Sequence, residues 1–391
     1  MRYALRAAGF GGPAAETWNI HYEAVRRRRR GEDVILLVGD PDFGTPLPIV
    51  EAAKASLDQG RTHYADVTGQ PPLRAAIAAQ HARLTGQQVS PDQVVVLAGA
   101  QCALFVAFQC LVDPGDEVIA FEPAYVTYPA TVAAAGAILV PVPLRPENGF
   151  HLDPADLRRA LTPRTRAILW NSPNNPTGAV ATAEELAALA STACEHDLWL
   201  VSDEVYATLV FTGQHRSPAA LPGMAERTVT VSSVSKSHAM TGWRLGWLIG
   251  PEPLAHHAGR LALCMLYGSP GFIQDAATTA LAHDLPELAT MRERFRRRRD
   301  TVLDHLANLP GIRCHEPAGG MFVMLDVRAT GRSATDFAYG LLAAENVSLL
   351  PGDAFGSPAA GHVRLSLTVS EERLVEACGR IRRHLLALAD R

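Results

Sequence analysis

The sequence contains no apolar run that approaches the ~20 residues of a membrane-spanning helix, so no membrane partner is expected. The opening stretch MRYALRAAGFGGPAAETW carries scattered arginines but lacks the long apolar core of a secretory signal. The six cysteines form no CxxC pair, which favours free thiols in a reducing compartment, and we expect no metal site. Together these absences predict a cytoplasmic protein.

The charges show no strong excess of either sign. With 36 Lys and Arg against 40 Asp and Glu, the formal net charge of −4 predicts no nucleic-acid partner. Two arginine runs, Arg26–Arg30 and Arg296–Arg299, could bind a polyanion, but we favour solvent-exposed helix faces. The first run fits the basic last turn of a helix that ends near Gly31.

From about residue 90 the chain alternates short apolar runs with alanine-rich stretches. The apolar runs predict buried strands at 94–98, 117–121, 137–142, 166–170, 198–202 and 228–233. Helices are predicted between them at 102–111, 124–136 and 182–197, the last opening with Thr182 and Glu185 at capping-box spacing. This alternation predicts an α/β protein with a mostly parallel sheet, and ligands bind such sheets at the carboxyl ends of the strands.

The last hundred residues follow a different pattern. A long amphipathic helix is predicted at 285–309, with short strands near 319–327 and 362–368. A chain of 391 residues exceeds one average domain. We therefore expect a large domain at 46–284 and a smaller α+β domain formed by 1–45 and 285–391.

Several short motifs fall at the predicted strand ends. They are GAQCAL (99–104), EPAY (122–125), NSPNNPTG (171–178), SDEVY (202–206) and SVSK (233–236). A glycine before a helix N-terminus can cradle a phosphate, and a carboxylate at a buried strand end needs a cationic partner. Each motif alone could be an ordinary turn or core segment. Their joint order is very unlikely by chance, and it predicts a site for pyridoxal 5′-phosphate (PLP).

In this interpretation Lys236 forms the Schiff base with the cofactor, and Asp203 keeps the pyridine nitrogen protonated so that the ring accepts electrons. Asn175 and Tyr206 hydrogen-bond the ring oxygen, and Tyr125 stacks on the ring. The phosphate is expected to lie against Ala100, Gln101, Ser233 and Arg244. The expected catalytic residues are Lys236, Asp203 and Tyr206.

The same motifs, from GDPDFGTP (39–46) to HVRLSLT (362–368), resemble those of the class I/II aminotransferases, PLP enzymes of fold type I. The resemblance implies a ping-pong exchange of an amino group between an amino acid and a 2-oxo acid, with Lys236 moving the proton. It also implies that Arg364 clamps the substrate carboxylate beside the backbone of Gly39. Tyr64 would reach the cofactor of the neighbouring subunit, which implies a homodimer with shared sites. The alternative for Arg364 is an exposed arginine at a strand edge.

The substrate side chain is less well defined. Two positions that carry a basic residue in dicarboxylate-specific relatives are Cys264 and Gln101 here, which favours a neutral, aromatic or cationic substrate. Stretches such as WNIHY, LALCMLYGSP and SKSHAMTGWR are similar to the arginine–pyruvate transaminases of this family. This implies L-arginine with pyruvate, or a cyclic guanidino amino acid of antibiotic biosynthesis such as enduracididine.

Several residues could hold a guanidinium group, although each could equally be a surface or packing residue. They are Glu16, Asn19, Tyr22 and Tyr267, and Asn175 is also expected near the substrate. Aromatic or kynurenine-type aminotransferases and PLP-dependent carbon–sulfur β-lyases share the cofactor motifs, so both remain alternatives. A non-catalytic ligand-binding domain is disfavoured because the reactive lysine is retained.

Overall fold

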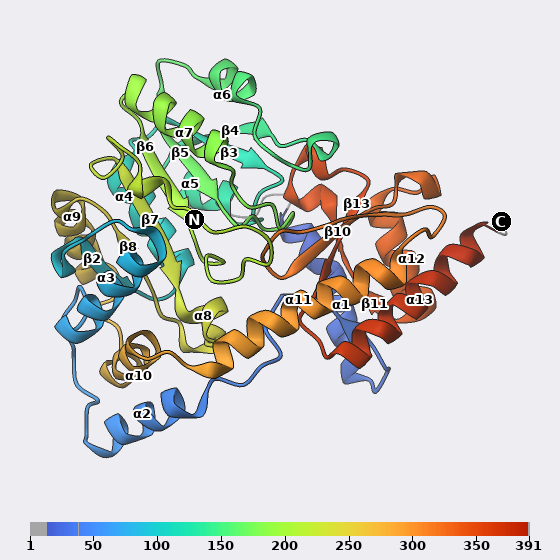
Figure 1. Ribbon diagram of the computed structural model, residues 1–391, viewed down its shortest axis with the longest axis horizontal. Coiled ribbons are helices and arrows are strands. Elements are labelled where there is room, and N and C mark those ends of the chain that lie inside the picture. The colour runs from blue at the N-terminus through green and yellow to red at the C-terminus, as the bar shows by residue number, and fades with distance from the viewer. Residues whose placement is uncertain (1–13, 38, 390–391) are drawn as a thin grey trace, which may run out of the picture.

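The computed structural model describes residues 14–37 and 39–389, and its centre is a seven-stranded sheet (Figure 1). The strands, in their order across the sheet, are β2 (Val94–Leu97), β8 (Gly246–Ile249), β7 (Thr228–Ser233), β6 (Trp199–Asp203), β5 (Thr165–Asn171), β3 (Glu117–Glu122) and β4 (Ile138–Pro143). Strand β8 is antiparallel to both of its neighbours, and the other pairings are parallel. The predicted mostly parallel sheet is confirmed, although sequence analysis did not find β8.

Both faces of this sheet are covered by helices. The helices of this part of the chain are α2 (Leu47–Asp58), α3 (Pro71–Thr85), α4 (Ala100–Leu111), α5 (Tyr128–Ala134), α6 (Pro154–Ala160), α7 (Ala183–Glu195), α8 (Val234–Ser237), α9 (Glu252–Met265) and α10 (Gly271–Ala282). Because successive strand residues face opposite sides, Val118 and Ala120 of β3 pack in the cluster with α4 and α9. Ile119 and Phe121 pack in a second cluster with α7.

The structure confirms one predicted helix start and corrects another. The capping box predicted before α7 is present, since the Thr182 hydroxyl accepts from the Glu185 N–H and the Glu185 carboxylate accepts from the Thr182 N–H. The helix predicted at 124–136 begins only at Tyr128. The residues just before it form a loop at the end of β3, and this loop brings Tyr125 to the carboxyl edge of the sheet.

The remaining elements build a second, smaller group around a four-stranded sheet of order β12-β13-β10-β9. Its elements are α1 (Ala14–Arg29), β1 (Ile35–Leu36), α11 (Pro286–Leu306), β9 (Arg313–His315), β10 (Phe322–Asp326), α12 (Ala334–Glu345), β11 (Val347–Ser348), β12 (Leu350–Pro351), β13 (His362–Ser366) and α13 (Glu371–Ala389). Strand β1 pairs in parallel with β11, with Ile35 opposite Val347. The N-terminal segment thus joins the C-terminal elements, while the domain boundaries predicted at 45 and 285 stay predictions.

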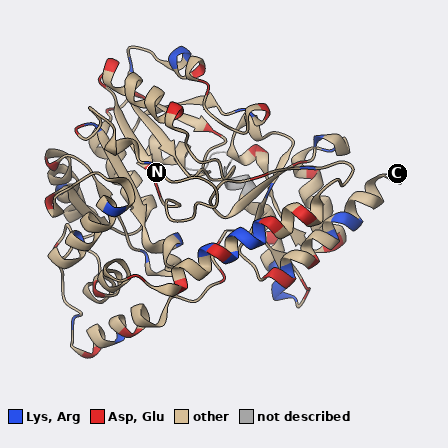
Figure 2. Ribbon diagram, viewed as in Figure 1, with Lys and Arg blue, Asp and Glu red and all other residues tan. Residues whose placement is uncertain are grey.

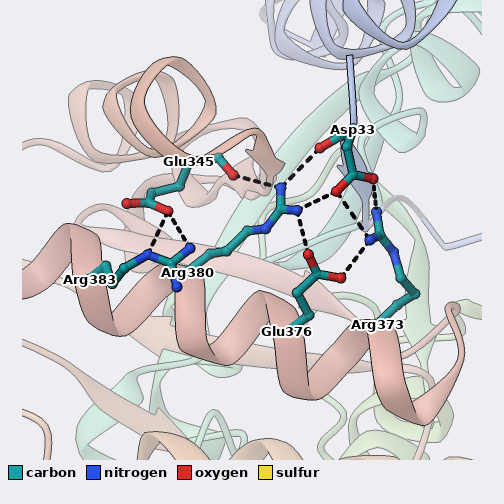
Figure 3. Close-up of polar contacts among 6 residues, drawn as sticks. All are labelled: Asp33, Glu345, Arg373, Glu376, Arg380 and Arg383. Atoms are coloured by element: carbon teal, nitrogen blue, oxygen red, sulfur yellow. Dashed lines mark hydrogen bonds and ion pairs between the residues drawn. The ribbon is translucent and has the colours of Figure 1, made fainter. Parts of the chain in front are cut away.

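An ion-pair network holds the segment before β1 to helix α13. Figure 3 shows its members, which are Asp33, Glu345, Arg373, Glu376, Arg380 and Arg383. Asp33 is the central acceptor: its carboxylate binds Arg373 at 2.7 Å and also binds Arg380. The Arg380 guanidinium also donates to the backbone oxygen of Glu345, at the end of α12. The network therefore ties three separate chain segments together.

The prediction for the second arginine run was only half right. Figure 2 shows acidic and basic residues mixed along α11. Arg296 is half-buried and Arg297 is exposed, and both pair with Glu293. Arg298 and Arg299 are buried instead. Arg298 donates to both Asp42 oxygens, at 2.6 and 2.8 Å, because its guanidinium points inward from α11 to the 39–46 segment. This ion pair between the buried Arg298 and the exposed Asp42 anchors the segment that enters the site described below.

No helix in the described part of the chain is long and apolar enough to cross a membrane. The six cysteines are free, as their spacing predicted. The cytoplasmic location stays a prediction.

Candidate active site

A cavity of about 540 Å³ opens at the carboxyl edge of the large sheet, where it meets the smaller sheet. Most of the predicted site residues line it: Gly39, Ala100, Gln101, Tyr125, Asn175, Asp203, Tyr206, Ser233, Lys236, Arg244 and Arg364. The parallel strands explain this convergence, because Asn171, Asp203 and Ser233 each end a strand at the same edge. Strand β8 runs the opposite way, so Arg244, just before its start, reaches the same edge.

Lys236 lies on α8, the single turn of helix that follows β7. Its Nζ donates to the backbone oxygen of Gly39 at 2.9 Å, across from the 39–46 segment. Burial lowers the pKa of Lys236 to about 8, and the positive charges of Arg364 and Arg244 act in the same direction. The amine can therefore lose its proton near neutral pH, which a nucleophile or a proton carrier must do.

Asp203 is buried at the end of β6. Its Oδ2 accepts from the Tyr128 hydroxyl at 2.7 Å, and its Oδ1 accepts from the Val205 N–H at 3.2 Å. Burial raises the pKa of Asp203 to about 6 in spite of these two donors. A cation placed beside this carboxylate would relieve the cost of burial, which is what a protonated ring nitrogen would do.

The N-terminus of α4 and Arg244 form a concave cradle. Gly99 precedes the helix with a φ of +87°, and a Cβ there would lie 2.4 Å from Nη2 of Arg244. A Cβ on Gly246 would lie 2.6 Å from the backbone nitrogen of Ala100, so this position is also restricted to glycine. Arg244 is positioned by the backbone oxygens of Thr241 and Ala98, at 2.7 and 3.2 Å. Free N–H groups beside an arginine fork suit a phosphate.

Arg364 is buried on β13 and is not the exposed strand-edge arginine of the alternative interpretation. Its Nη1 donates to Oδ1 of Asn175 at 2.8 Å, and its guanidinium lies 4.0 Å from the ring centroid of Phe322. Burial lowers the pKa of Arg364 to about 10, so the guanidinium remains charged at neutral pH. A buried cation that faces a cavity is suited to a carboxylate ligand.

Two tyrosines complete the wall beside Asp203. Tyr206 is buried, and burial raises its pKa. The Tyr125 ring meets that of Tyr128 edge to face, with the centroids 5.7 Å apart. Both predicted tyrosines thus face the cavity.

Gln101 lines the cavity, but its side chain is held elsewhere. Its amide nitrogen donates to the Thr131 hydroxyl at 2.7 Å, and its oxygen accepts from Thr127 at 2.6 Å. The side chain thus ties α4 to the start of α5. The contact of the Gln101 backbone with a phosphate stays a prediction.

Sequence reasoning missed some residues of the site. Tyr128 and Asn171 position Asp203, the latter by donating to its backbone oxygen at 2.9 Å. Asn171 belongs to the NSPNNPTG motif, and Tyr128 follows Tyr125 by three residues. Both therefore lie in or beside motifs that had already been assigned to the site, and this position could have identified them. Trp18 and Asp40 also line the cavity and were not predicted. Both lie in stretches that carry the family resemblance, Trp18 in WNIHY and Asp40 in GDPDFGTP, so the resemblance held a signal for them.

Four other predicted residues, Tyr64, Tyr267, Tyr22 and Asn19, do not line this cavity. Tyr64 is 86% exposed, and its ring packs on that of Tyr267 with centroids 4.8 Å apart. Tyr22 and Asn19 are exposed on α1. The side chain of Glu16 lies outside the described part of the structure.

Comparison with known proteins identifies the family. The family model for aminotransferase class I and II matches residues 32–381. The chain belongs to this family. It is 57% identical over 382 residues to the arginine–pyruvate transaminase AruH of Pseudomonas aeruginosa, covering 97% of each protein. It is 42% identical over 370 residues to an aspartate/prephenate aminotransferase of Thermus thermophilus, covering 94% of each.

Solved structures show the same fold. A structure of aspartate aminotransferase from Thermus thermophilus with maleate superposes with a TM-score of 0.93 at 41% identity, covering 98% of this chain and 100% of that one. A Thermotoga maritima aspartate aminotransferase gives a TM-score of 0.93 at 36% identity, covering 98% and 100% of the two chains. Fold type I is thereby confirmed.

Aminotransferases of this class depend on PLP, and so does this enzyme. The cavity fits that cofactor in three respects. It offers a half-buried amine at Lys236, a buried acid at Asp203 that lacks a charged partner among the described residues, and a cradle at Gly99 and Arg244. These are the groups that the aldehyde, the ring nitrogen and the phosphate require.

Proposed function

We propose that this aminotransferase takes the α-amino group from a guanidino amino acid, with L-arginine as the first candidate donor and pyruvate as the acceptor. The observation that carries the proposal is the identity of 57% to an arginine–pyruvate transaminase over nearly the full length of both proteins. Cofactor residues are common to enzymes of different substrate preference, so the choice of donor must come from the rest of the cavity wall.

When bound, PLP supplies an aldehyde and a ring that accepts electrons. The roles proposed for the protein groups follow from their positions. Lys236 would hold the cofactor and afterwards carry the proton that leaves the substrate Cα, for which a pKa of about 8 is suitable. Asp203 would hold the proton of the ring nitrogen. Arg364 would bind the α-carboxylate of donor and acceptor in turn, which suits a ping-pong cycle in one cavity.

Asp40 supports a cationic donor. Among the described residues that line the cavity, the carboxylates are those of Asp203 and Asp40. If Asp203 serves the ring nitrogen, Asp40 is left to face the substrate side chain. Its Oδ1 accepts from the Thr241 hydroxyl at 2.8 Å, which fixes the carboxylate at the mouth of the cavity. Trp18 lines the same cavity and offers an indole face on which a guanidinium can stack.

An Asp40→Asn variant tests this assignment. We expect its KM for L-arginine to rise by roughly tenfold to a hundredfold, because a charge-assisted pair is worth about 1.5–3 kcal/mol. The KM for a neutral donor of similar length, such as norleucine, should change little. Asp40 also raises the pKa of Lys236, so a shift of the pH profile common to both donors reports that separate effect. An equal loss for both donors would contradict a guanidinium contact.

A panel of amino donors tests the function as a whole. Purified holoenzyme should form alanine from pyruvate fastest with L-arginine or with a cyclic guanidino amino acid such as enduracididine. Faster turnover of phenylalanine or kynurenine would instead support the aromatic alternative. Release of ammonia and pyruvate from cystathionine would support the β-lyase.

We further propose a homodimer in which Tyr64 serves the cofactor site of the partner. The proposal is supported by the exposure of Tyr64, Tyr267 and Tyr22, which is unusual for large aromatic side chains on one chain. Mixing inactive Tyr64→Phe and Lys236→Ala subunits should restore part of the activity in hybrid dimers, because one of the two sites would be intact. Proven subunit exchange without any recovery would count against shared sites.

A further inference from the structure

A partly buried cluster of two histidines and one carboxylate lies on the smaller sheet, apart from the active site. His315 ends β9, Asp326 ends β10 and His362 begins β13. Asp326 lies directly opposite His362, and His315 lies opposite Met324, two residues before Asp326. Since residues two apart on a strand face the same side, the three side chains share one face of the sheet. None of them lines the active-site cavity.

The spacing and the unpartnered atoms of the cluster resemble those of a metal site without its ion. One nitrogen or oxygen atom from each of the three residues lies within 4.8 Å of the other two. The Nε2 atoms of His315 and His362 are buried and make no hydrogen bond within the described structure. His362 itself is fully buried. Buried polar atoms normally have a partner, so two such nitrogens beside one carboxylate require an explanation.

The tautomer of His362 strengthens the case for a missing cation. Its Nδ1 lies 3.0 Å from the backbone oxygen of Ala360, which can only accept, so Nδ1 carries the proton. In the neutral ring Nε2 therefore presents a lone pair. It faces Oδ2 of Asp326 at 3.9 Å, so a lone pair and a negative charge point at each other. A cation between them would turn this repulsion into two favourable contacts.

The surroundings would hold such an ion in place. The Phe150 ring packs edge to face on both imidazoles, with centroids 4.9 Å from His315 and 5.9 Å from His362. Arg328 binds both oxygens of Asp326, at 3.0 and 2.7 Å, and orients the carboxylate. A carboxylate offers about four lone-pair positions, so this contact leaves acceptor capacity for a metal. Glu147 lies 3.7 Å from Arg328 and offsets part of its positive charge.

We propose that His315, Asp326 and His362 bind one divalent transition-metal ion, with zinc as the preferred ion. Two imidazoles and one carboxylate are ligands for zinc and its neighbours in the first transition row, while magnesium and calcium prefer oxygen alone. In a tetrahedral zinc site, ligand atoms lie about 3.3 Å apart, so the separations between the three side chains need to shorten by up to about 1.5 Å. A water molecule would take the fourth position.

The expected role of the ion is structural. It would link β9, β10 and β13, and Phe150 would shield it from the side of the large sheet. Sequence analysis did not find these ligands, because His315 and His362 are 47 positions apart and the three residues share no motif. Only the pairing of the strands brings them together.

Metal titration of the chelator-treated holoenzyme tests the proposal. Equilibrium dialysis with Zn²⁺ should give one ion per chain, and Co²⁺ should give visible absorption typical of mixed nitrogen and oxygen ligands. Affinity should fall by at least about tenfold in His315→Ala, His362→Ala and Asp326→Asn, since even outer-shell changes cost about 10–100-fold. The matched control is a His256→Ala/His257→Ala double variant, because these neighbouring histidines are exposed on α9.

The possible results either support the metal site or overturn it. Binding that is lost in the control variant and kept in the cluster variants would overturn the proposal, as would the absence of binding by the unmodified holoenzyme. If a cluster variant fails to fold, anomalous diffraction at the zinc edge from unmodified crystals decides the question. A peak between the three side chains supports the site, and its absence in zinc-soaked crystals refutes it.

Discussion

Replacement of Asp203 by asparagine should stabilise the apoenzyme while it impairs catalysis. Burial raises the pKa of Asp203 from its ordinary value of 3.8 to about 6, so the folded protein pays to ionise this group. At about 1.4 kcal/mol per pH unit, the cost at neutral pH is about 3 kcal/mol. Asparagine is not charged and can keep both contacts, by donating to Tyr128 and accepting from Val205.

The sign of the pH dependence follows from proton linkage. Below about pH 4, Asp203 is protonated in the folded and the unfolded chain, and the ionisation cost is absent. Between about pH 4 and pH 6 the unfolded chain loses this proton while the folded chain retains it, so wild-type stability falls as the pH rises through that window. Above about pH 6 the full cost is present. The Asp203→Asn variant does not lose stability in this way, because asparagine does not ionise.

Urea unfolding of cofactor-free wild-type and Asp203→Asn protein, measured from pH 4 to pH 8 at one protein concentration, provides the assay. The advantage of the variant should grow by about 3 kcal/mol across the window. A Tyr128→Phe variant should extend the window to higher pH, because the Tyr128 hydroxyl lowers the pKa of Asp203. Reconstituted Asp203→Asn enzyme should lose at least about a hundredfold in kcat. A stability difference that is constant with pH, or a variant less stable than wild type at pH 8, would refute the reasoning.

The remaining predictions concern the lysines and the ion-pair network. The chain has two lysines, and borohydride reduction of the holoenzyme should label Lys236 and leave Lys54 unlabelled. The Lys236→Ala variant should lose both turnover and the absorbance of the lysine-bound cofactor. The control variant Lys54→Ala should keep both. Asp33→Asn should lower Tm more than Glu51→Gln, a matched change in an exposed helix pair, and added salt should shrink this difference. Equal Tm values for these two variants would show that the network adds nothing beyond a single surface pair.

The residues predicted to bind the cofactor meet in one cavity because their positions are fixed by local structure. Asp203 and Lys236 follow apolar runs that form adjacent parallel strands, β6 and β7, so one rule about strand ends placed both. Strand β8 was missed because it is short and antiparallel, which the expected alternation of strand and helix does not include. The burial of Arg298 was missed for a similar reason. Its partner Asp42 is 256 positions away in the chain, and a run of arginines gives no sign of which one points inward.

The substrate side was predicted less well, and α1 shows why. Trp18 and Tyr22 are four residues apart, so they lie on the same face of the helix. Sequence reasoning chose Tyr22, yet the cavity is lined by Trp18 one turn earlier, and Tyr22 is exposed. Helical periodicity fixes which face of α1 points toward the site, but the point where the cavity ends along that face depends on how the smaller sheet packs on the large one. The same dependence hid Asp40, which reaches the cavity because the Asp42–Arg298 pair anchors its segment to α11. The residues predicted to contact the cofactor thus lie at strand ends, whereas the rest of the cavity wall depends on long-range packing. A change in that second part of the wall can alter the substrate of an enzyme without altering its cofactor chemistry.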